Sequence, residues 1–230
     1  SNDIEKHPIL PLEQATVYLC GEKQTTDITK GLRHHIGRAQ AKQLYLGKEH
    51  NRMSSAEFED VAWEDLRNFH KGKPMMYSLW YGKQCSGYCG TGEWLRRWDT
   101  GADSSCPNCA QAVEDADHLN RCPDFGRSQL WKRQVAELEE WLHSHHTQYH
   151  LARLIPAYLM GRGRINFIDA GDNINIEGGI PRGIRQAGHR QDCIGWRHFT
   201  EGKVSLRIRE VQEYYLALQP NTELTIDSWM

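Results

Sequence analysis

Apolar residues recur every three or four positions along most of the chain, and this period is typical of amphipathic helices. The pattern is clear from residue 54 to 98, from 130 to 159 and from 194 to 218. Residues 15–20 are β-prone instead; Gly21 then turns the chain, and residues 24–26 return as a second short strand. The pattern therefore predicts a mainly α protein, a helical bundle-like body with a short N-terminal β-hairpin.

Three of the predicted helices carry a specific signal. Ser54 and Glu57 form an S-x-x-E capping box, which begins a helix. A helix that starts near Asp27 is expected to pack through an inner face that carries Ile28, Leu32, Ile36 and Ala39. Near the C-terminus, apolar spacings of 4, 3, 4 and 3 indicate a seam that packs on another helix: Val204, Ile208, Val211, Tyr215 and Leu218.

Residues 161–190 interrupt the helical period. Seven glycines and Pro181 favour a loop there, and the segment also holds Arg162, Arg164, Arg182, Arg185 and Arg190. Arginines pair with phosphates, and glycines let backbone N–H groups approach them, so this segment is the best candidate for nucleic-acid contact. A second basic stripe lies on the first long helix: Lys30, Arg33, Arg38 and Lys42. The alternatives are a flexible connector for the first and a solvated helix face for the second.

Composition narrows the class of protein. The 230 residues, 39% of them apolar, suit one large domain or two small ones. No run approaches about 18 consecutive apolar residues, and the first residues lack a secretion signal. We therefore expect an intracellular protein, cytoplasmic or nuclear and not secreted, without a membrane partner. The net charge of -2 does not predict a phosphate-binding surface over the whole chain.

The seven cysteines are better explained as metal ligands than as disulfides, because the number is odd and a reducing compartment is expected. Cys106 and Cys109 form a C-P-x-C turn, which brings two thiolates to one ion. His118 and Cys122 are four residues apart, so one helical turn directs both at the same point. Three thiolates and one imidazole suit tetrahedral Zn²⁺ with no open position. We therefore expect one structural zinc ion in a small hairpin; the alternatives are accidental spacing or redox pairing.

The negative net charge of this hairpin argues against its surface as a nucleic-acid-binding site. Residues 101–124 carry five acidic residues against Arg121 alone, a net of -4. Three thiolates and one zinc ion add another negative charge. Cation-mediated phosphate binding needs the opposite sign, so a structural role within a larger helical body is the better interpretation.

Other metal-ligating residue types lie outside this motif. His143, His146 and His150, with His145 beside them, could form a second metal site, but a hydrophilic helix end is the commoner meaning of such a pattern. Cys85 and Cys89 are read as core or turn thiols rather than ligands. Cys20 and Cys193 are expected to be buried. Asp117 or Asp124 could orient the His118 ring, although each alone is more often a surface carboxylate.

Two stretches of the chain resemble a known group of proteins. They are Gly90-Thr-Gly-Glu-Trp-Leu-Arg-Arg-Trp98 with the Cys/His motif and Val113-Glu-Asp115, and the tail from Gln191 to Gly202. Both are similar to the zinc-binding region downstream of the reverse transcriptase in retroelement-derived proteins of algal and protist type. The resemblance implies a zinc-binding accessory module whose partners are RNA or DNA and other domains of a retroelement polyprotein. The paired aspartates of a polymerase site are missing, so polymerase activity is not implied.

A catalytic interpretation has little support in the sequence. Asp117-His118 beside a C-x-x-C is similar to HNH nucleases, but the downstream Asn and His of that motif do not follow. Acidic residues lie mostly on predicted helix surfaces, which does not favour a ribonuclease H site. A degenerate HNH-like nuclease is therefore the third alternative, after a structural or protein-interaction domain that positions a neighbouring polymerase or nuclease.

The sequence as a whole predicts a non-catalytic zinc-binding module that assists nucleic-acid binding. Its expected organisation is an N-terminal hairpin and helix (1–52), a helical segment with the Cys3His hairpin (53–124), and a helical C-terminal region (125–230) that contains the Gly/Arg-rich loop 161–190.

Overall fold

The computed structural model describes residues 17–19, 21–24, 27–47, 53–86, 88–172, 174, 176 and 178–219. This part of the protein is mainly helical, as predicted. Two three-residue strands, β1 (Val17–Leu19) and β2 (Glu22–Gln24), pair antiparallel with Tyr18 opposite Lys23. The rest of the predicted hairpin, at residues 15, 16, 20, 25 and 26, lies outside the described residues, so the hairpin stays a prediction.

The described residues form twelve helices, several of which begin at a side-chain cap. The predicted capping box is confirmed: Ser54 accepts from the backbone N–H of Glu57, whose carboxylate accepts from the N–H of Ser54. The helices are α1 (Ile28–Leu46), α2 (Ser55–Glu59), α3 (Trp63–His70), α4 (Met75–Ser86), α5 (Gly92–Trp98), α6 (His118–Arg121), α7 (Phe125–Ser144), α8 (Tyr149–Met160), α9 (Phe167–Asp172), α10 (Arg182–Ile194), α11 (Trp196–Thr200) and α12 (Leu206–Ala217).

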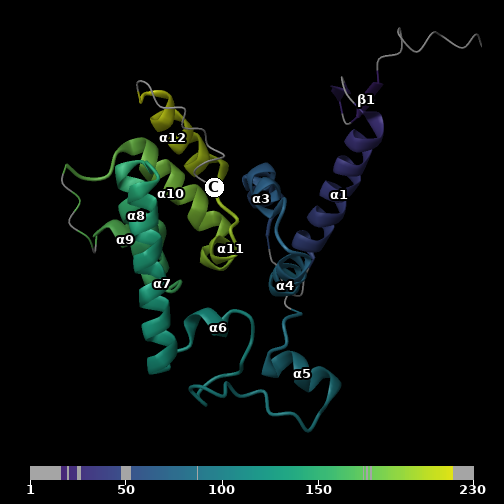
Figure 1. Ribbon diagram of the computed structural model, residues 1–230, viewed down its shortest axis with the longest axis vertical. Helices are drawn as coiled ribbons and strands as arrows, with labels where there is room; N and C mark the ends of the chain where they lie inside the picture. Colours follow the sequence, from purple (N-terminus) through teal and green to yellow (C-terminus); the bar gives the residue numbers. More distant parts are fainter. Residues whose placement is uncertain are drawn as a thin grey trace, which may run out of the picture.

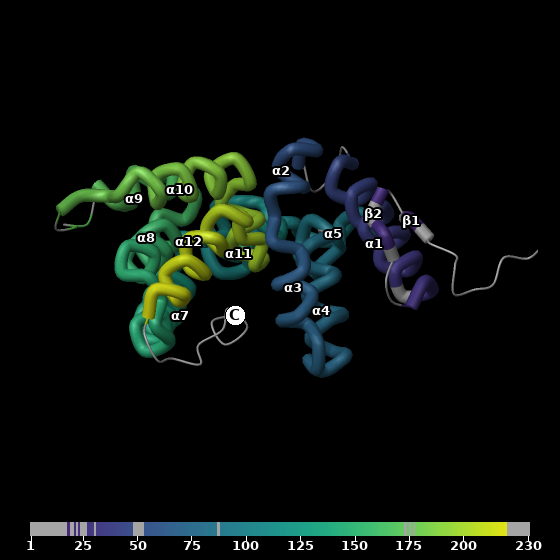
Figure 2. The backbone as a smooth tube through the Cα atoms, turned by 90° about the horizontal axis from the view of Figure 1, so that it is seen from above, coloured from purple at the N-terminus to yellow at the C-terminus, as the bar shows by residue number. Residues whose placement is uncertain are grey.

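The helices gather in two groups, with α1 at one end. In Figure 1, α7 to α12 pack together on one side, and α3, α4 and α5 lie on the other. The view from above in Figure 2 agrees, and it places α1 at the outer edge of the second group. Helix α6 lies between the two groups in Figure 1. The Cys/His motif therefore lies in the connection between them.

The main hydrophobic core belongs to the group α7–α12. Leu151, Leu154 and Tyr158 on α8 are at most 1% exposed and pack with Phe167 and Ile208. A smaller core joins α1 and α2 to α10 through Tyr45, Phe58, Val61 and Ile194. At roughly 25 cal/mol per Å² of buried apolar surface, the α8 face contributes most to the stability of this group. The C-terminal seam is confirmed in part: α12 packs on α10, Ile208 is buried, and Val204 and Val211 pack against the main core, whereas Leu218 is 61% exposed.

A buried polar joint connects the two groups. Val61 forms an isolated β-bridge with Ser205, and the N–H of Ala62 donates to the carbonyl of Val204 at 2.9 Å. Gln191 of α10 is fully buried; its amide donates to the carbonyl of Lys203 and accepts from the N–H of Ser205 at 2.8 Å. Every one of these buried amide groups is satisfied, so the joint fixes how the groups meet.

Two sequence predictions about this fold are wrong. Part of the predicted loop 161–190 is helical, because α9 and α10 cover residues 167–172 and 182–194. Ile184, Ala187 and Gln191 recur at helical spacing and form the buried face of α10. The glycines around them made this helical pattern hard to recognise in the sequence. The predicted inner face of α1 is not an inner face: Ile28, Leu32 and Ile36 are 46–49% exposed, because α1 packs through a different side.

The predicted division at residues 52 and 124 stays a prediction. Hydrogen bonds cross the second boundary, among them that of Arg162 to the carbonyl of Cys122 at 2.8 Å. In the part of the chain that the structure describes, no helix combines the length and apolar character that crossing a bilayer requires.

Candidate metal centre

The first half of the motif is a tight hairpin. Ser105 and Val113 form an isolated antiparallel bridge, and the N–H of Cys106 donates to the carbonyl of Ala112 at 2.8 Å. The N–H of Ala110 donates to the carbonyl of Cys106 at 2.8 Å, and Ala110 has a positive φ of 53°. This turn places the thiols of Cys106 and Cys109 on the same side of the hairpin.

The second half of the motif is the short helix α6. His118 begins α6 and Cys122 follows its last residue, so one turn directs both side chains at the hairpin, as predicted. The carboxylate of Asp115 accepts the backbone N–H of His118 at 2.6 Å and thereby fixes the start of this turn. The ligand atoms of Cys106, Cys109, His118 and Cys122 all lie within 4.8 Å of one another, so these four residues could hold a metal ion.

The spacing of the four donor atoms fits a tetrahedral zinc ion. Bonds of about 2.3 Å to sulfur and about 2.0 Å to nitrogen give a tetrahedron with S···S edges of about 3.8 Å and S···N edges of about 3.5 Å. The Sγ atoms of Cys106 and Cys122 are 3.7 Å apart, and Cys109 Sγ lies 3.4 Å from His118 Nε2. These thiols are free rather than disulfide-bonded. The donor set and these two edges therefore match Zn²⁺ coordination.

The surroundings of the two buried sulfurs differ. Burial raises the pKa of the Cys106 thiol, but the backbone N–H groups of Cys109 and Asn108 and the His118 ring outweigh burial and lower this pKa to about 6. Burial raises the pKa of Cys122 to about 11, and the neighbouring Cys106 sulfur adds to the rise. Two thiolates at 3.7 Å repel each other, so a bound divalent cation would favour the ionisation of both.

The acidic residues of the hairpin have structural partners. Asp103 accepts the N–H of Ser105 at 2.8 Å, and Asp124 accepts the N–H of Arg127 as the N-cap of α7. Asp117 pairs with Arg121 at 3.0 Å. Asp117 and Asp124, which the sequence offered as partners of the His118 ring, therefore serve an ion pair and a helix cap.

Arg162 joins the metal centre to the helical core. Its guanidinium donates to the carbonyl of the ligand Cys122 at 2.8 Å and to the hydroxyl of Ser128 at 3.3 Å. The same group lies 5.6 Å from the ring centre of Trp131, a cation–π contact, while the indole N–H of Trp131 donates to the end of α8. Arg162 has a positive φ of 49°, so the local backbone is strained to place this side chain.

A second arginine–tryptophan pair lies beside the first. Arg121, next to the ligand Cys122, stacks 5.2 Å from the ring centre of Trp196, whose indole donates to the carbonyl of Tyr158. Gly163 leaves room for this arrangement, since a Cβ there would come within 2.5 Å of the Arg121 guanidinium. The Cys122 arm of the centre is therefore held on the end of α8 by two stacked pairs.

The other arm of the centre is held on α5. The carboxylate of Glu114 accepts the N–H of Gly92 at 2.9 Å, and its carbonyl accepts the N–H of Glu93 at 3.1 Å. A Cβ at Gly92 would come within 3.1 Å of the backbone of Ser104, so this close approach requires glycine. A metal ion bound by both arms would connect α5 to the end of α8.

The structure separates the arginines that the sequence grouped as nucleic-acid candidates. The guanidinium of Arg162 is hydrogen-bonded to the carbonyl of Cys122, and no sequence signal indicated this contact. Arg164 is exposed in the turn after α8, whereas Arg182, Arg185 and Arg190 are exposed on α10. On α1, Arg38 and Lys42 both pair with Glu59, and Arg33 is exposed. The side chain of Lys30 lies outside the described part of the structure.

The remaining candidate ligands do not form a second site. Among the described residues, the Cys/His cluster is the one group of three or more potential ligands close enough to share an ion. His145 stacks on Trp141 with ring centres 4.2 Å apart, and His150 contacts Gln148. Cys85 and Cys89 are buried, as predicted, and Cys20 lies outside the described residues. The prediction for Cys193 is wrong, because it is exposed on the outer face of α10.

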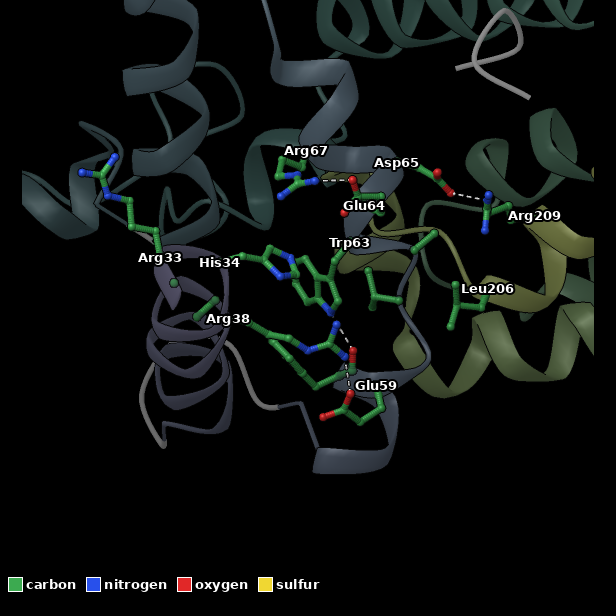
Figure 3. Close-up of a pocket in the computed structure, with 15 residues that line it drawn as sticks. Arg33, His34, Arg38, Glu59, Trp63, Glu64, Asp65, Arg67, Leu206 and Arg209 are labelled. Carbon is green, nitrogen blue, oxygen red and sulfur yellow. Dashed lines mark hydrogen bonds and ion pairs between the residues drawn. The ribbon is translucent and has the colours of Figure 1, made fainter. Parts of the chain in front are cut away.

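A pocket of about 560 Å³ lies between α1, α3 and the start of α12 (Figure 3). Most of its charged groups are paired: Arg38 with Glu59, Arg67 with Glu64, and Arg209 with Asp65. Figure 3 shows these pairs around Trp63 and Arg33 pointing away from them. The pocket is therefore a boundary between helices lined with ion pairs, and the Cys/His cluster remains the better candidate site.

The comparisons with known proteins add no relative from which a function could be inferred. No family model, no curated protein and no solved structure matches this chain.

Proposed function

We propose that the protein is a non-catalytic zinc-binding module whose ion is structural. The supporting observation is the set of four protein donors around one point, Cys106, Cys109, His118 and Cys122. Four protein ligands complete a tetrahedral zinc site, which leaves no position for water or substrate. His118 directs Nε2 into the cluster, so it acts as a ligand rather than as the general base of an HNH-like nuclease.

The ion would cross-link two segments that are anchored on different helices. One segment is anchored on α5 through Glu114, the other on the end of α8 through Arg162. Metal binding to a site absent from the unfolded chain contributes directly to folding free energy. Zinc would therefore stabilise the connection between the two helix groups beyond what the buried joint at Val61 and Ser205 provides.

Nucleic-acid binding is the biological use that we propose for this module. The support is α10, where Arg182, Arg185 and Arg190 are exposed. The acidic residue of this helix, Asp192, is half-buried and accepts the N–H of Phe167 at 2.7 Å. The exposed side of α10 is therefore basic, as phosphate contacts require. The sequence resemblance supports an accessory role in a retroelement protein, next to polymerase or nuclease domains.

Cobalt substitution tests the metal assignment. Co²⁺ in a tetrahedral site with three thiolates gives intense visible bands and a sulfur-to-cobalt charge-transfer band, and zinc displaces it. We expect these bands in the wild type and in the control Cys193→Ser, and their loss or shift in Cys109→Ser. A spectrum typical of six-coordinate cobalt, or one unchanged in Cys109→Ser, contradicts the proposal.

Salt-dependent binding tests the nucleic-acid role. Binding of single-stranded RNA and DNA is measured from 50 to 300 mM salt for the wild type and for Arg182, Arg185 and Arg190 changed together to glutamine. We expect the slope of log affinity against log salt to fall by about 2 in the triple variant, about 0.7 for each lost phosphate contact. Arg133→Gln on α7 is the control. Binding that is absent or insensitive to salt rejects the role and leaves the metal assignment intact.

A further inference from the structure

A cavity of about 600 Å³ lies between the two helix groups, and none of its lining residues belongs to the Cys/His cluster. One wall comes from α3 and α4, and the other comes from α7, α8 and α11. Figure 1 places α4 and α7 in different groups, so the cavity is formed where the groups meet. Boundaries of this kind are common places for ligand sites, which are typically about 300–1,000 Å³ in volume. The cavity is therefore large enough to accept a ligand.

Aromatic rings line both walls of this cavity. Trp80 of α4 is 55% exposed and Phe69 of α3 is 38% exposed, although both are large apolar side chains. On the other wall, Trp131 and Trp141 of α7 are half-buried. Aromatic rings on two walls favour a flat aromatic ligand, because its ring can stack on theirs.

The polar groups of the lining restrict the ligand further. The two carboxylates of the lining are already paired, Asp65 with Arg209 at 2.8 Å and Glu201 with Lys203. Three side-chain amides also line the cavity: Gln84, Asn120 and Gln134. An amide both donates and accepts hydrogen bonds, which suits the polar edge of a nucleobase. The lining therefore favours an uncharged ring with polar edges over an ion.

The rim of the cavity beside α3 and α4 is basic. Residues 66–92 hold no aspartate or glutamate and four cations: Arg67, Lys71, Lys73 and Lys83. Arg67 pairs with Glu64, whereas the three lysines are exposed, and within the described part of the chain none of them is paired with a carboxylate. Lys73 Nζ lies 4.4 Å from the ring centre of Phe69, so a cation adjoins a ring of the lining. Such lysines are available to bind phosphates.

A single strand of nucleic acid fits this combination of groups. Its bases are accessible for stacking and its phosphates remain outside, whereas the bases of a duplex are already paired and stacked. An apolar peptide would leave the rim lysines without an anion. A lipid surface would contact projecting side chains and leave the recessed rings and amides unused.

We propose that this cavity, the α4–α7 cleft, takes an unstacked base of single-stranded RNA or DNA, while Lys73 and Lys83 at its rim contact the adjoining phosphates. The rings of Trp80 and of α7 stack on the base, and the amides contact its edge. This proposal rests on the nucleic-acid role proposed above, but it assigns that role to a surface other than α10.

Binding of oligonucleotides to the full chain with added Zn²⁺ tests the stacking contact. The probes are labelled oligo(dT) and oligo(U) of about 12 nucleotides and a duplex of the same length. We expect both single strands to bind more tightly than the duplex. Trp80→Ala should weaken single-strand binding about tenfold, and Trp80→Phe should retain most of it because a ring remains. The control is Trp98→Ala, which removes a 78% exposed ring of α5 outside the cavity.

The rim lysines are tested by the salt dependence of the same binding. Lys73→Gln and Lys83→Gln should each lower the slope of log affinity against log salt by about 0.7, whereas Arg133→Gln, on the opposite side of α7 from the cavity, should not. An affinity that falls in the α10 triple variant and not in Trp80→Ala overturns the cleft and leaves the nucleic-acid role intact. The reverse result supports the cleft and excludes α10 as the contact. Absence of any strand binding rejects both.

Four other results overturn the proposal. Equal binding of duplex and single strand shows contact through phosphates alone. Binding of a free mononucleotide as tightly as the oligonucleotide identifies a small-molecule site. Binding to vesicles with anionic lipids that Trp80→Ala abolishes identifies a lipid surface. A larger fall in melting temperature in Trp80→Ala than in Trp98→Ala shows that the Trp80 ring is already packed within the protein, whereas equal melting temperatures support an open cleft.

Discussion

The guanidinium of Arg162 donates to the backbone carbonyl of Cys122 at 2.8 Å, which connects a candidate metal ligand directly to the end of α8. The same side chain reaches Ser128 and stacks over Trp131. The sequence offered Arg162 as a nucleic-acid contact because it lies in a segment rich in arginine and glycine. In the structure, Arg162 is instead a structural link. The metal centre and the helical core are coupled through this side chain, and the coupling can be measured.

Arg162→Met should destabilise the protein by about 1–3 kcal/mol, because it removes two charged hydrogen bonds and a cation–π contact. Urea unfolding measures the loss. The matched control is Arg164→Met, since Arg164 is exposed in the same turn. Equal stability of the two variants would contradict the structural role of Arg162.

The two glycines Gly188 and Gly183 of α10 should respond to alanine with opposite signs. A Cβ at Gly188 would lie 2.6 Å from Ile168 Cδ1 and 3.0 Å from Phe167 Cδ1, so Gly188→Ala should cost about 1–3 kcal/mol through overpacking. Nothing lies within 4 Å of a Cβ at Gly183, so Gly183→Ala should stabilise by about 0.4–1 kcal/mol. Thermal unfolding of both variants tests whether α10 packs on α9 as described.

The buried ion pair of Lys203 and Glu201 should be costly to break on one side only. Their side chains are 0% and 3% exposed, and the lysine also contacts Cys85 Sγ at 3.5 Å. Lys203→Met leaves a buried carboxylate without its lysine partner and should cost about 3–5 kcal/mol. Adding Glu201→Gln should recover part of that loss. A double variant as unstable as the sum of the two single ones would show that the pair does not interact.

Acid should remove the contribution of Glu201. Burial alone raises the pKa of this carboxyl, but donation from His198 and the charge of Lys203 outweigh burial and hold the pKa below its ordinary value of 4.5. A depressed pKa in the folded state stabilises the protein above the unfolded pKa, and this contribution is lost as pH falls through the folded pKa. The difference in unfolding free energy between wild type and Glu201→Gln should therefore be constant above about pH 5.5 and shrink below pH 4.5. A difference that grows on acidification would contradict the assignment.

Local signals in the sequence predicted the helical class and the clustering of the four Cys/His side chains well. The capping box at Ser54 and the spacing of Cys106, Cys109, His118 and Cys122 depend on residues close in sequence, and the structure contains both. Such features need few long-range contacts, so their chemistry can be recognised before the fold is known.

Features that depend on distant contacts could not be predicted in the same way. The apolar stripe of Ile28, Leu32 and Ile36 has the period of a buried face, but periodicity does not say which molecule covers it. Lysine and glutamate are residue types usually found on solvated surfaces. Lys203 and Glu201 are buried instead, because Cys85 and Tyr45, which lie on helices distant in sequence, pack against Lys203. Arg162 is likewise given its role by a carbonyl forty residues away.

The central claim, that one zinc ion holds the fold together, is tested most directly by metal analysis of the purified protein and thermal melts before and after chelation. The account predicts one zinc ion per chain, a clear fall in melting temperature when it is removed, and recovery when zinc is restored. Cys106→Ser should melt like the chelated wild type and gain nothing from added zinc, whereas Cys193→Ser should behave as wild type. A metal-free protein, or a bound ion whose removal leaves the melting temperature unchanged, would contradict the account.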